Sequence, residues 1–147
     1  MSHSNYDALK LNNQLCFPIY AASREVIKQY RPFLDEMDLT YTQYIAMMVF
    51  WEDRKLNVKE LGQRLLLDSG TLTPVLKNLE SKGYVRRYRS TEDERVLLVE
   101  ITPEGHALRD KAITIPLELA KRVNLDSDEC LQLYTLLYKV LNRPVEP

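Results

Sequence analysis

Cys16 is one of only two cysteines among 147 residues, and its neighbours are of the kind that activates a thiol. Cysteine reacts as the thiolate, which helix N-termini, cations and hydrogen-bond donors stabilise. Tyr20 follows one helical turn later and can donate its hydroxyl to the sulfur. Pro18 either kinks a helix beside Cys16 or begins one there, which would place the thiol near a positive helix end. The pattern indicates redox chemistry at Cys16, and the competing interpretation is a small buried core residue.

The second cysteine, Cys130, lies in line with Leu133 and Leu137 on a predicted helix, where a leucine would fill the same place. We therefore expect it to have a structural role. The two cysteines are more than a hundred residues apart and neither belongs to a C-x-x-C pair. Neither a disulfide framework nor a zinc site is expected.

Enzymatic use of Cys16, as in a thiol peroxidase, would need a general base or a strong cationic activator. The two histidines are His3, near the N-terminus, and His106, in a predicted helix, and no motif ties either of them to Cys16. We therefore expect no enzyme, no cofactor and no metal ion.

Residues 67–76 (LDSGTLTPVL) open a predicted helix whose two faces differ. Leucines at spacings of four and three should pack inward: Leu72, Leu76 and Leu79. A helix fits the major groove of DNA with its N-terminal end toward the bases. Hydroxyl groups near that end can reach base edges or phosphates: Ser69, Thr71 and Thr73. Lys77 and Asn78 then face the same way.

Basic residues are concentrated around the end of this helix, although the formal net charge of the chain is only −1. Between residues 77 and 89, five bases accompany the single acid Glu80: Lys77, Lys82, Arg86, Arg87 and Arg89. A local patch of this kind suits phosphate contacts, whereas the overall balance argues against a generic polybasic binder. Taken alone, the patch is equally typical of a solvated charged face.

Helix starts are marked by capping boxes, in which a capping side chain is paired with a Glu or Gln three residues later. Three boxes predict helices ending near residues 52, 65 and 141: Thr40 with Gln43, Asn57 with Glu60, and Asp126 with Glu129. Proline is tolerated at the first helical position. Thr102 and Pro103 therefore predict one long helix that runs to about residue 123.

Prolines also bear on the other two predicted helices. Apolar residues at spacings of three and four predict a first helix that Pro32 should stop: Leu11, Leu15, Ile19, Ala22, Val26 and Tyr30. The helix after Asp68 should close at Gly83, in the left-handed position that favours glycine. Pro74 is tolerable only near a first turn, so this helix should begin at Asp68 with some distortion, or later near Thr71.

Residues 84–89 and 95–101 are β-rich runs joined by a charged five-residue loop, which predicts an antiparallel hairpin. A short helix, a tight connection, a polar second helix and a basic hairpin form the order of a winged helix-turn-helix. In the hairpin, Arg86 and Arg89 suit phosphates, and Arg95 suits a narrow minor groove. The predicted fold class is mainly α with a small β-hairpin.

Residues 67–76, with 93–95 (DER) after them, resemble the MarR family of bacterial transcriptional regulators, over about residues 11–141. The resemblance implies that the chain is one domain. It also implies that the protein is a homodimer that binds a pseudo-palindromic operator in double-stranded DNA. Intertwined dimerisation helices would lie at about 8–31 and 103–142, and the winged helix-turn-helix at about 40–102. The last predicted helix is apolar on all sides, which is unusual for the surface of a monomer and agrees with a homodimer. The residues expected to bind DNA are Ser69, Thr71, Thr73, Pro74, Lys77, Asn78, Arg86, Arg89, Asp93 and Arg95.

Residues 13–17 (NQLCF), followed by Tyr20, Arg24 and Tyr30 and then by 39–41, resemble the OhrR branch of that family, the organic-hydroperoxide sensors, and the related staphylococcal thiol regulators. The resemblance implies that Cys16 is the sensor. It also implies three hydrogen-bonding tyrosines: Tyr20, Tyr30 and Tyr41. Tyr30 lies fourteen residues along the same helix, about 21 Å away, so it cannot touch the Cys16 of its own chain. Any contact must come from the partner subunit.

These expectations combine into a one-cysteine redox repressor of peroxide-resistance genes. Organic hydroperoxide would oxidise Cys16 to a sulfenic acid, which ends as a mixed disulfide with a low-molecular-weight thiol or over-oxidises. The altered interface would change the spacing of the recognition helices and release the operator. The alternative that stays open is a MarR-type regulator that responds to a small-molecule effector other than an oxidant. A cysteine-dependent peroxidase is the third, less favoured interpretation. The longest apolar run, residues 45–51, is too short to cross a bilayer, so we expect a cytoplasmic protein without a membrane partner.

Overall fold

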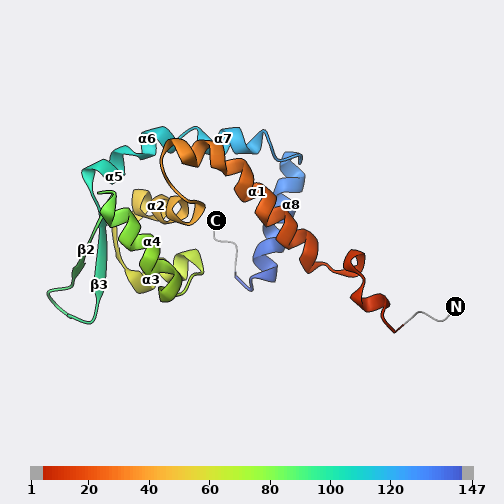
Figure 1. The fold of residues 1–147 in the computed structure, drawn as a ribbon, viewed down its shortest axis with the longest axis horizontal. Coiled ribbons are helices and arrows are strands. Elements are labelled where there is room, and N and C mark those ends of the chain that lie inside the picture. The colour runs from red at the N-terminus through yellow and green to blue at the C-terminus, as the bar shows by residue number, and fades with distance from the viewer. Residues whose placement is uncertain (1–4, 144–147) are drawn as a thin grey trace. The chain divides into compact units, whose positions relative to one another are not determined.

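The computed structural model describes residues 5–143, and the chain divides into two compact units, Met1–Ile115 and Pro116–Pro147. Figure 1 traces their elements. The first unit holds short 3-10 helices at Asp7–Leu9 and Leu11–Asn13, then α1 (Cys16–Glu36), α2 (Tyr41–Asp53), β1 (Lys55–Asn57), α3 (Val58–Leu65), α4 (Ser69–Ser81), β2 (Val85–Arg89), β3 (Leu97–Ile101), α5 (Pro103–Ala107) and α6 (Arg109–Ala112). α7 (Ile115–Ala120) begins at the boundary, and α8 (Ser127–Val140) lies in the second unit.

The expected fold class is confirmed: the described chain is mainly helical with a small antiparallel sheet. The predicted hairpin is present as β2 and β3. A third strand, β1, pairs with the edge of β3 that β2 leaves free, so β3 is the central strand. Val99 lies at the centre of the sheet, opposite both Leu56 and Arg87, and is fully buried. A strand of three residues is too short to show an alternating pattern, so β1 was not predicted from the sequence.

Local capping chemistry sets the helix starts as predicted. All three capping boxes form, before α2, α3 and α8. At the first of them the Gln43 backbone N–H donates to the Thr40 hydroxyl oxygen at 3.2 Å, and the Thr40 backbone N–H donates to the Gln43 amide oxygen at 3.1 Å. The Thr102 side chain likewise accepts from the Gly105 N–H at 3.0 Å and begins α5.

Of the two outcomes expected for Pro18, the structure has the second, because α1 begins at Cys16 and does not extend back to Leu11. Pro18 therefore lies in the first turn, where its missing N–H removes no helical hydrogen bond. The expected C-terminal bound of this helix is wrong. Pro32 does not stop α1, which continues to Glu36. One lost backbone hydrogen bond is offset there by tertiary packing, because Leu34 and Met37 are buried at the end of the helix.

The single helix expected from residue 103 to about 123 is also wrong, because three short helices occupy this stretch. Pro116 has no N–H to donate to the carbonyl of Ala112, so the helical hydrogen bonding is interrupted between α6 and α7. The β-branched run 113–115 adds to the break, because such side chains lose rotamer freedom in a helix. The division between the two units falls at the same place.

The core of the first unit is built on the apolar stripe of α4. Leu72, Leu76 and Leu79 are buried, as predicted, together with Phe50 of α2 and Leu61 of α3. α4 begins directly after Asp68 and includes Pro74, which confirms the earlier of the two expected starts. Gly83 follows the helix with φ +78°, the left-handed conformation expected for it. Among residues 5–143, no helix is both long enough and apolar enough to cross a membrane.

Candidate functional site

α4 presents a polar face to solvent opposite its buried leucines. All six residues of this helix that we expected to bind DNA are exposed on it: Ser69, Thr71, Thr73, Pro74, Lys77 and Asn78. Asp68 caps the helix by accepting from the Thr71 backbone N–H at 2.7 Å, and this hydrogen bond lowers the pKa of its carboxyl group. The Thr73 hydroxyl donates to the Ser69 carbonyl oxygen at 2.7 Å. Its remaining lone pairs can accept from a base amino group, but the hydroxyl cannot also donate to a phosphate.

The wing is the hairpin of β2 and β3 with its connecting loop. At the loop, the Arg95 guanidinium donates to both carboxylate oxygens of Asp93, at 3.1 and 3.2 Å, while 90% of the Arg95 side chain is exposed. These hydrogen bonds lower the pKa of Asp93. Since Asp93 is an acid, its place beside Arg95 fits a role in orienting that guanidinium better than a direct contact with phosphate. Arg89 is exposed on the same hairpin.

The basic patch is smaller than the sequence indicated, because three of its five bases have acidic partners. Arg86 pairs with Glu100 at 3.0 Å, Arg87 with Glu80 at 3.1 Å, and Lys82 with Asp38 at 3.5 Å. The Arg86 guanidinium also lies 4.8 Å from the ring centroid of Tyr88. Within residues 5–143, Lys77 and Arg89 form no ion pair. We therefore expect these two to contribute most of the patch's attraction for an anion.

Cys16 is the first residue of α1 and is exposed. The capping residue before it, Leu15, has no side-chain acceptor, so no cap satisfies the free N–H groups of the first turn. These groups and the positive end of the helix dipole favour an anion such as a thiolate. Tyr20 is exposed one turn later, and the Arg24 guanidinium lies 5.5 Å from its ring centroid.

Tyr30 and Tyr41 meet where α1 packs on α2. Their ring centroids are 5.0 Å apart, and Tyr44, which we did not expect at the site, completes a triangle at 5.7 and 6.2 Å. Burial raises the pKa of all three phenols, that of Tyr44 to about 12. A phenol with the ordinary pKa of about 10 is already protonated at neutral pH, so the raised pKa values only extend to higher pH the range in which these hydroxyls can donate. Tyr44 could have been found from its spacing, because it follows Tyr41 by three residues on one helix.

One chain does not bring all the expected sensor residues together. Cys16 and Tyr30 both lie on the continuous helix α1, so the fourteen residues between them correspond to about 21 Å. Tyr20 is near the cysteine end of this helix, and Tyr30 and Tyr41 are near the other end. A thiol and phenol contact that includes Tyr30 therefore needs a second chain.

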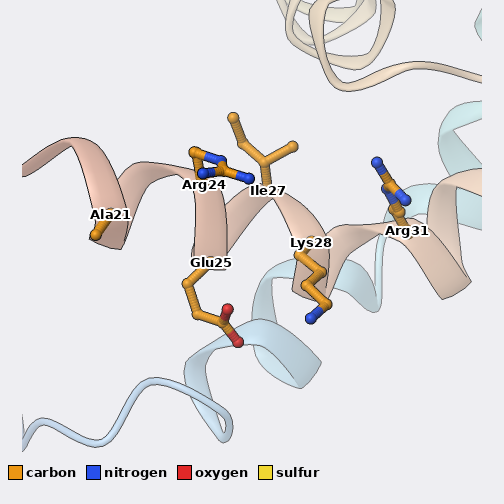
Figure 2. Close-up of a pocket in the computed structure, with 6 residues that line it drawn as sticks. All are labelled: Ala21, Arg24, Glu25, Ile27, Lys28 and Arg31. Carbon is orange, nitrogen blue, oxygen red and sulfur yellow. The ribbon is translucent and has the colours of Figure 1, made fainter.

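A hollow of about 550 Å³ runs along the middle of α1, lined by Ala21, Arg24, Glu25, Ile27, Lys28 and Arg31. Figure 2 shows Arg24 and Arg31 on one side of the helix and Glu25 and Lys28 on the other. The charges do not converge on one point, so this surface has the character of a solvated helix face.

Comparison with known proteins identifies the family of this chain. The family model of the transcriptional regulators SarA and Rot matches residues 28–112. The organic hydroperoxide resistance transcriptional regulator of Bacillus subtilis is 46% identical over 138 residues, which are 94% of each chain. The chain belongs to the MarR family, in its organic-hydroperoxide branch. The resemblance seen in the sequence is thereby confirmed.

Solved structures of this family have the same fold. The structure of reduced AbfR bound to DNA has a TM-score of 0.77 at 32% identity and covers 95% of this chain and 97% of that one. A mutant MarR from Escherichia coli complexed with operator DNA has a TM-score of 0.81 at 27% identity, with coverages of 95% and 99%. AbfR is a protein of Staphylococcus epidermidis that has also been solved overoxidised on DNA. These matches are with MarR-type transcriptional regulators and indicate no catalytic family.

The remaining candidates of the sequence are not among the residues of either surface. Cys130 is on the first turn of α8 and is exposed, with its sulfur 3.9 Å from the Leu125 carbonyl oxygen. His106 lies on α5, and its Nδ1 is buried without a hydrogen-bond partner among the described residues. His3 falls outside them. Within residues 5–143, no three His, Cys, Asp or Glu side chains are grouped so that they could hold a metal ion.

Proposed function

We propose that this MarR-family regulator is a homodimeric repressor that leaves its operator when organic hydroperoxide oxidises Cys16. The observation that carries the proposal is the position of Cys16, exposed at the first residue of a helix whose N-terminus has no side-chain cap. In one chain the sulfur is open to solvent, and a helix N-terminus of this kind favours anionic groups. The B. subtilis relative, whose name is that of an organic hydroperoxide resistance regulator, supports the choice of oxidant.

The chemistry at the sulfur is a two-electron oxidation. The Cys16 thiolate attacks the terminal oxygen of the hydroperoxide, the O–O bond breaks, and the other oxygen leaves as an alcohol after taking up a proton. The product is a sulfenic acid, which a low-molecular-weight thiol converts to a mixed disulfide with loss of water. The protein consumes one peroxide per thiol and is then inactive as a DNA binder, which distinguishes a sensor from a peroxidase.

The phenols connect this chemistry to the dimer. Tyr20 of the same chain, together with Tyr30 and Tyr41 of the partner subunit, would donate to the Cys16 thiolate across the interface. Both phenols are protonated at neutral pH, as tyrosines ordinarily are, so both can donate. A bulkier oxidised sulfur would displace these donors and shift one subunit on the other.

The polar face of α4 and the wing would then bind the two halves of a pseudo-palindromic operator, one from each subunit. On α4 this surface holds Ser69, Thr71, Thr73, Pro74, Lys77 and Asn78, and on the wing Arg86, Arg89, Asp93 and Arg95. Half-sites one turn of DNA apart, about 34 Å, require a fixed separation of the two recognition helices. A small shift of the subunits therefore weakens binding strongly. In this proposal the whole chain is one functional domain, with dimerisation regions at about residues 8–31 and 103–142.

An electrophoretic shift on the DNA upstream of the protein's own gene tests this function. The parent should bind when reduced and be released by an organic hydroperoxide. Cys16→Ser should bind as well as the parent and stay bound, because serine cannot form the sulfenic acid. Cys130→Ser is the matched control and should be released like the parent. Release of Cys16→Ser at the same peroxide concentration as the parent would rule the proposal out.

A further inference from the structure

The C-terminal ends of α1 and α4 close with the same hydrogen-bonded turn. After α1, the Asp38 N–H donates to the Asp35 carbonyl at 3.1 Å and the Leu39 N–H to the Leu34 carbonyl at 3.0 Å. After α4, the Gly83 N–H donates to Glu80 at 2.9 Å and the Tyr84 N–H to Leu79 at 3.0 Å. Asp38 and Gly83 are the left-handed residues of the two turns, with φ of 52° and 78°. Each turn holds its helix end in one geometry.

The side chain of Lys82 bridges these two helix ends. Lys82 is the last residue before the turn of α4, and its ammonium donates to the Asp38 carbonyl oxygen beyond the end of α1. The same nitrogen lies 3.5 Å from the Asp38 carboxylate and 3.4 Å from the Gln43 amide oxygen. Lys82 thus joins the first helix, the start of α2 and the recognition helix α4.

Electrostatics and burial both favour this position of the ammonium. The C-terminal end of a helix carries a partial negative charge, which a cation beyond the end of α1 offsets. Only 23% of the Lys82 side chain is exposed, so the contact is partly shielded from water and salt. Gln43 is 6% exposed, and its amide is fixed by the capping box with Thr40. The bridge is therefore anchored on a rigid acceptor.

We propose that Lys82 is a positioning residue that transmits the state of the thiol site to the recognition helix. The inference rests on the proposed redox function. Tyr30 lies on α1 two turns before its end, and Tyr41 is the first residue of α2, directly after the capping residue Thr40. A displacement of these phenols moves the turn that holds the Asp38 carbonyl. The ammonium carries that movement to the end of α4, and so to the face that meets DNA.

Operator affinity in both redox states tests the bridge. The measured quantity is the ratio of the Kd of the peroxide-treated protein to that of the reduced protein, from fluorescence anisotropy on the operator duplex. Lys82→Met keeps the aliphatic stem and loses the ammonium, and should lower this ratio at least about threefold. The rate of Cys16 oxidation should stay as in the parent, because the thiol is untouched. Lys82→Arg, which can donate to the same oxygens, should restore the ratio.

Lys59→Met is the matched control, because Lys59 is an exposed lysine of α3 and makes no contact with this bridge. Its ratio should equal that of the parent. A parent-like ratio for Lys82→Met, or an equally reduced one for Lys59→Met, would overturn the proposal.

Hydrogen exchange of backbone amides tests, in the absence of oxidant, whether Lys82 stabilises both helix ends. In Lys82→Met the Leu39 and Tyr84 amides, one in each turn, should lose protection together. Gln43→Glu keeps a capping-box acceptor and adds a charge opposite the ammonium, so protection at both amides should rise. If peroxide does not release the parent, the proposed function fails while the exchange result still decides on the bridge. Unchanged protection in both variants would contradict the inference.

Discussion

The Tyr44 ring contacts three other aromatic rings, with centroid distances of 5.7 Å to Tyr30, 6.2 Å to Tyr41 and 6.3 Å to Trp51. It is only 3% exposed. Ionisation of this phenol would place a negative charge in apolar surroundings, and burial therefore raises its pKa to about 12, with smaller contributions from the two neighbouring tyrosines. We infer that Tyr44 supports the two expected sensor phenols by packing and by keeping their surroundings dry.

The raised pKa of Tyr44 predicts a loss of stability in alkali. The folded protein holds this proton more tightly than the unfolded chain, so the free energy of unfolding is unaffected below pH 10 and falls as the pH rises from 10 towards about 12. The fall attributable to Tyr44 should not exceed about 3 kcal/mol. Urea unfolding of the parent and of Tyr44→Phe between pH 8 and 11.5 measures it, and the phenylalanine variant should show the flatter profile. Parallel profiles would show that this hydroxyl is not the group concerned.

At the level of the elements, α5 lies against the connection between α4 and β2. The Trp51 indole N–H donates to the Gly105 carbonyl at 2.9 Å, and the Thr102 hydroxyl donates to the Gly83 carbonyl at 2.6 Å. A Cβ at Gly105 would lie 2.1 Å from the carbonyl oxygen of Tyr84. Glycine is required here by the close approach of two backbones, which helps to hold the recognition helix and the wing in place.

Gly105→Ala should therefore destabilise the protein by about 2 kcal/mol or more, because the clash is with backbone and exceeds the gain of about 1 kcal/mol in helix propensity. Gly70→Ala, on the exposed side of α4, is the matched control. Its Cβ would come no closer than 3.4 Å to the nearest atom, so this change should be neutral or stabilising. Thermal unfolding of both variants measures the difference. Equal melting temperatures of the two variants would contradict this prediction, because the backbone at Tyr84 would then move aside at little cost in free energy.

The molecule as a whole leaves large apolar side chains uncovered in one chain. On α1 they include Phe17, Ile19 and Val26, and on α8 Leu131, Leu136 and Val140, of which the α8 residues are all about 60% exposed. Large apolar side chains left exposed on a long helix are typical of an interface between subunits. Since these helices are among those expected to dimerise, the exposure supports the homodimer in the proposed function.

A charge on this surface should separate the subunits. Leu133→Glu places a carboxylate on α8 within the apolar surface, where desolvation costs several kcal/mol, so sedimentation should show monomers at concentrations at which the parent is a dimer. Operator affinity should fall with it, because one half-site then binds alone. Gln132→Glu introduces the same charge at the neighbouring polar residue and should remain dimeric. A dimeric Leu133→Glu protein would move the interface away from this face of α8.

The features that could be predicted without the structure depend on residues close together in the chain. The capping boxes at Thr40, Asn57 and Asp126 and the left-handed Gly83 formed as expected, because their partners lie within a few residues. The buried leucine stripe of α4 followed from helical spacing alone. The family followed from the cysteine segment and residues 67–76. The roles of the individual site residues remain predictions.

Features whose energy comes from partners far away in the chain became visible only in the folded protein. Packing of Leu34 and Met37 carried α1 past Pro32, and β1 formed because β3, some forty residues later, offered an edge. Pairing across the fold also decided which bases remain available: Lys82 is engaged by Asp38, 44 residues away, whereas Lys77 stays on the exposed face of α4. Such contacts leave no periodic or local pattern, since each depends on where the whole chain folds.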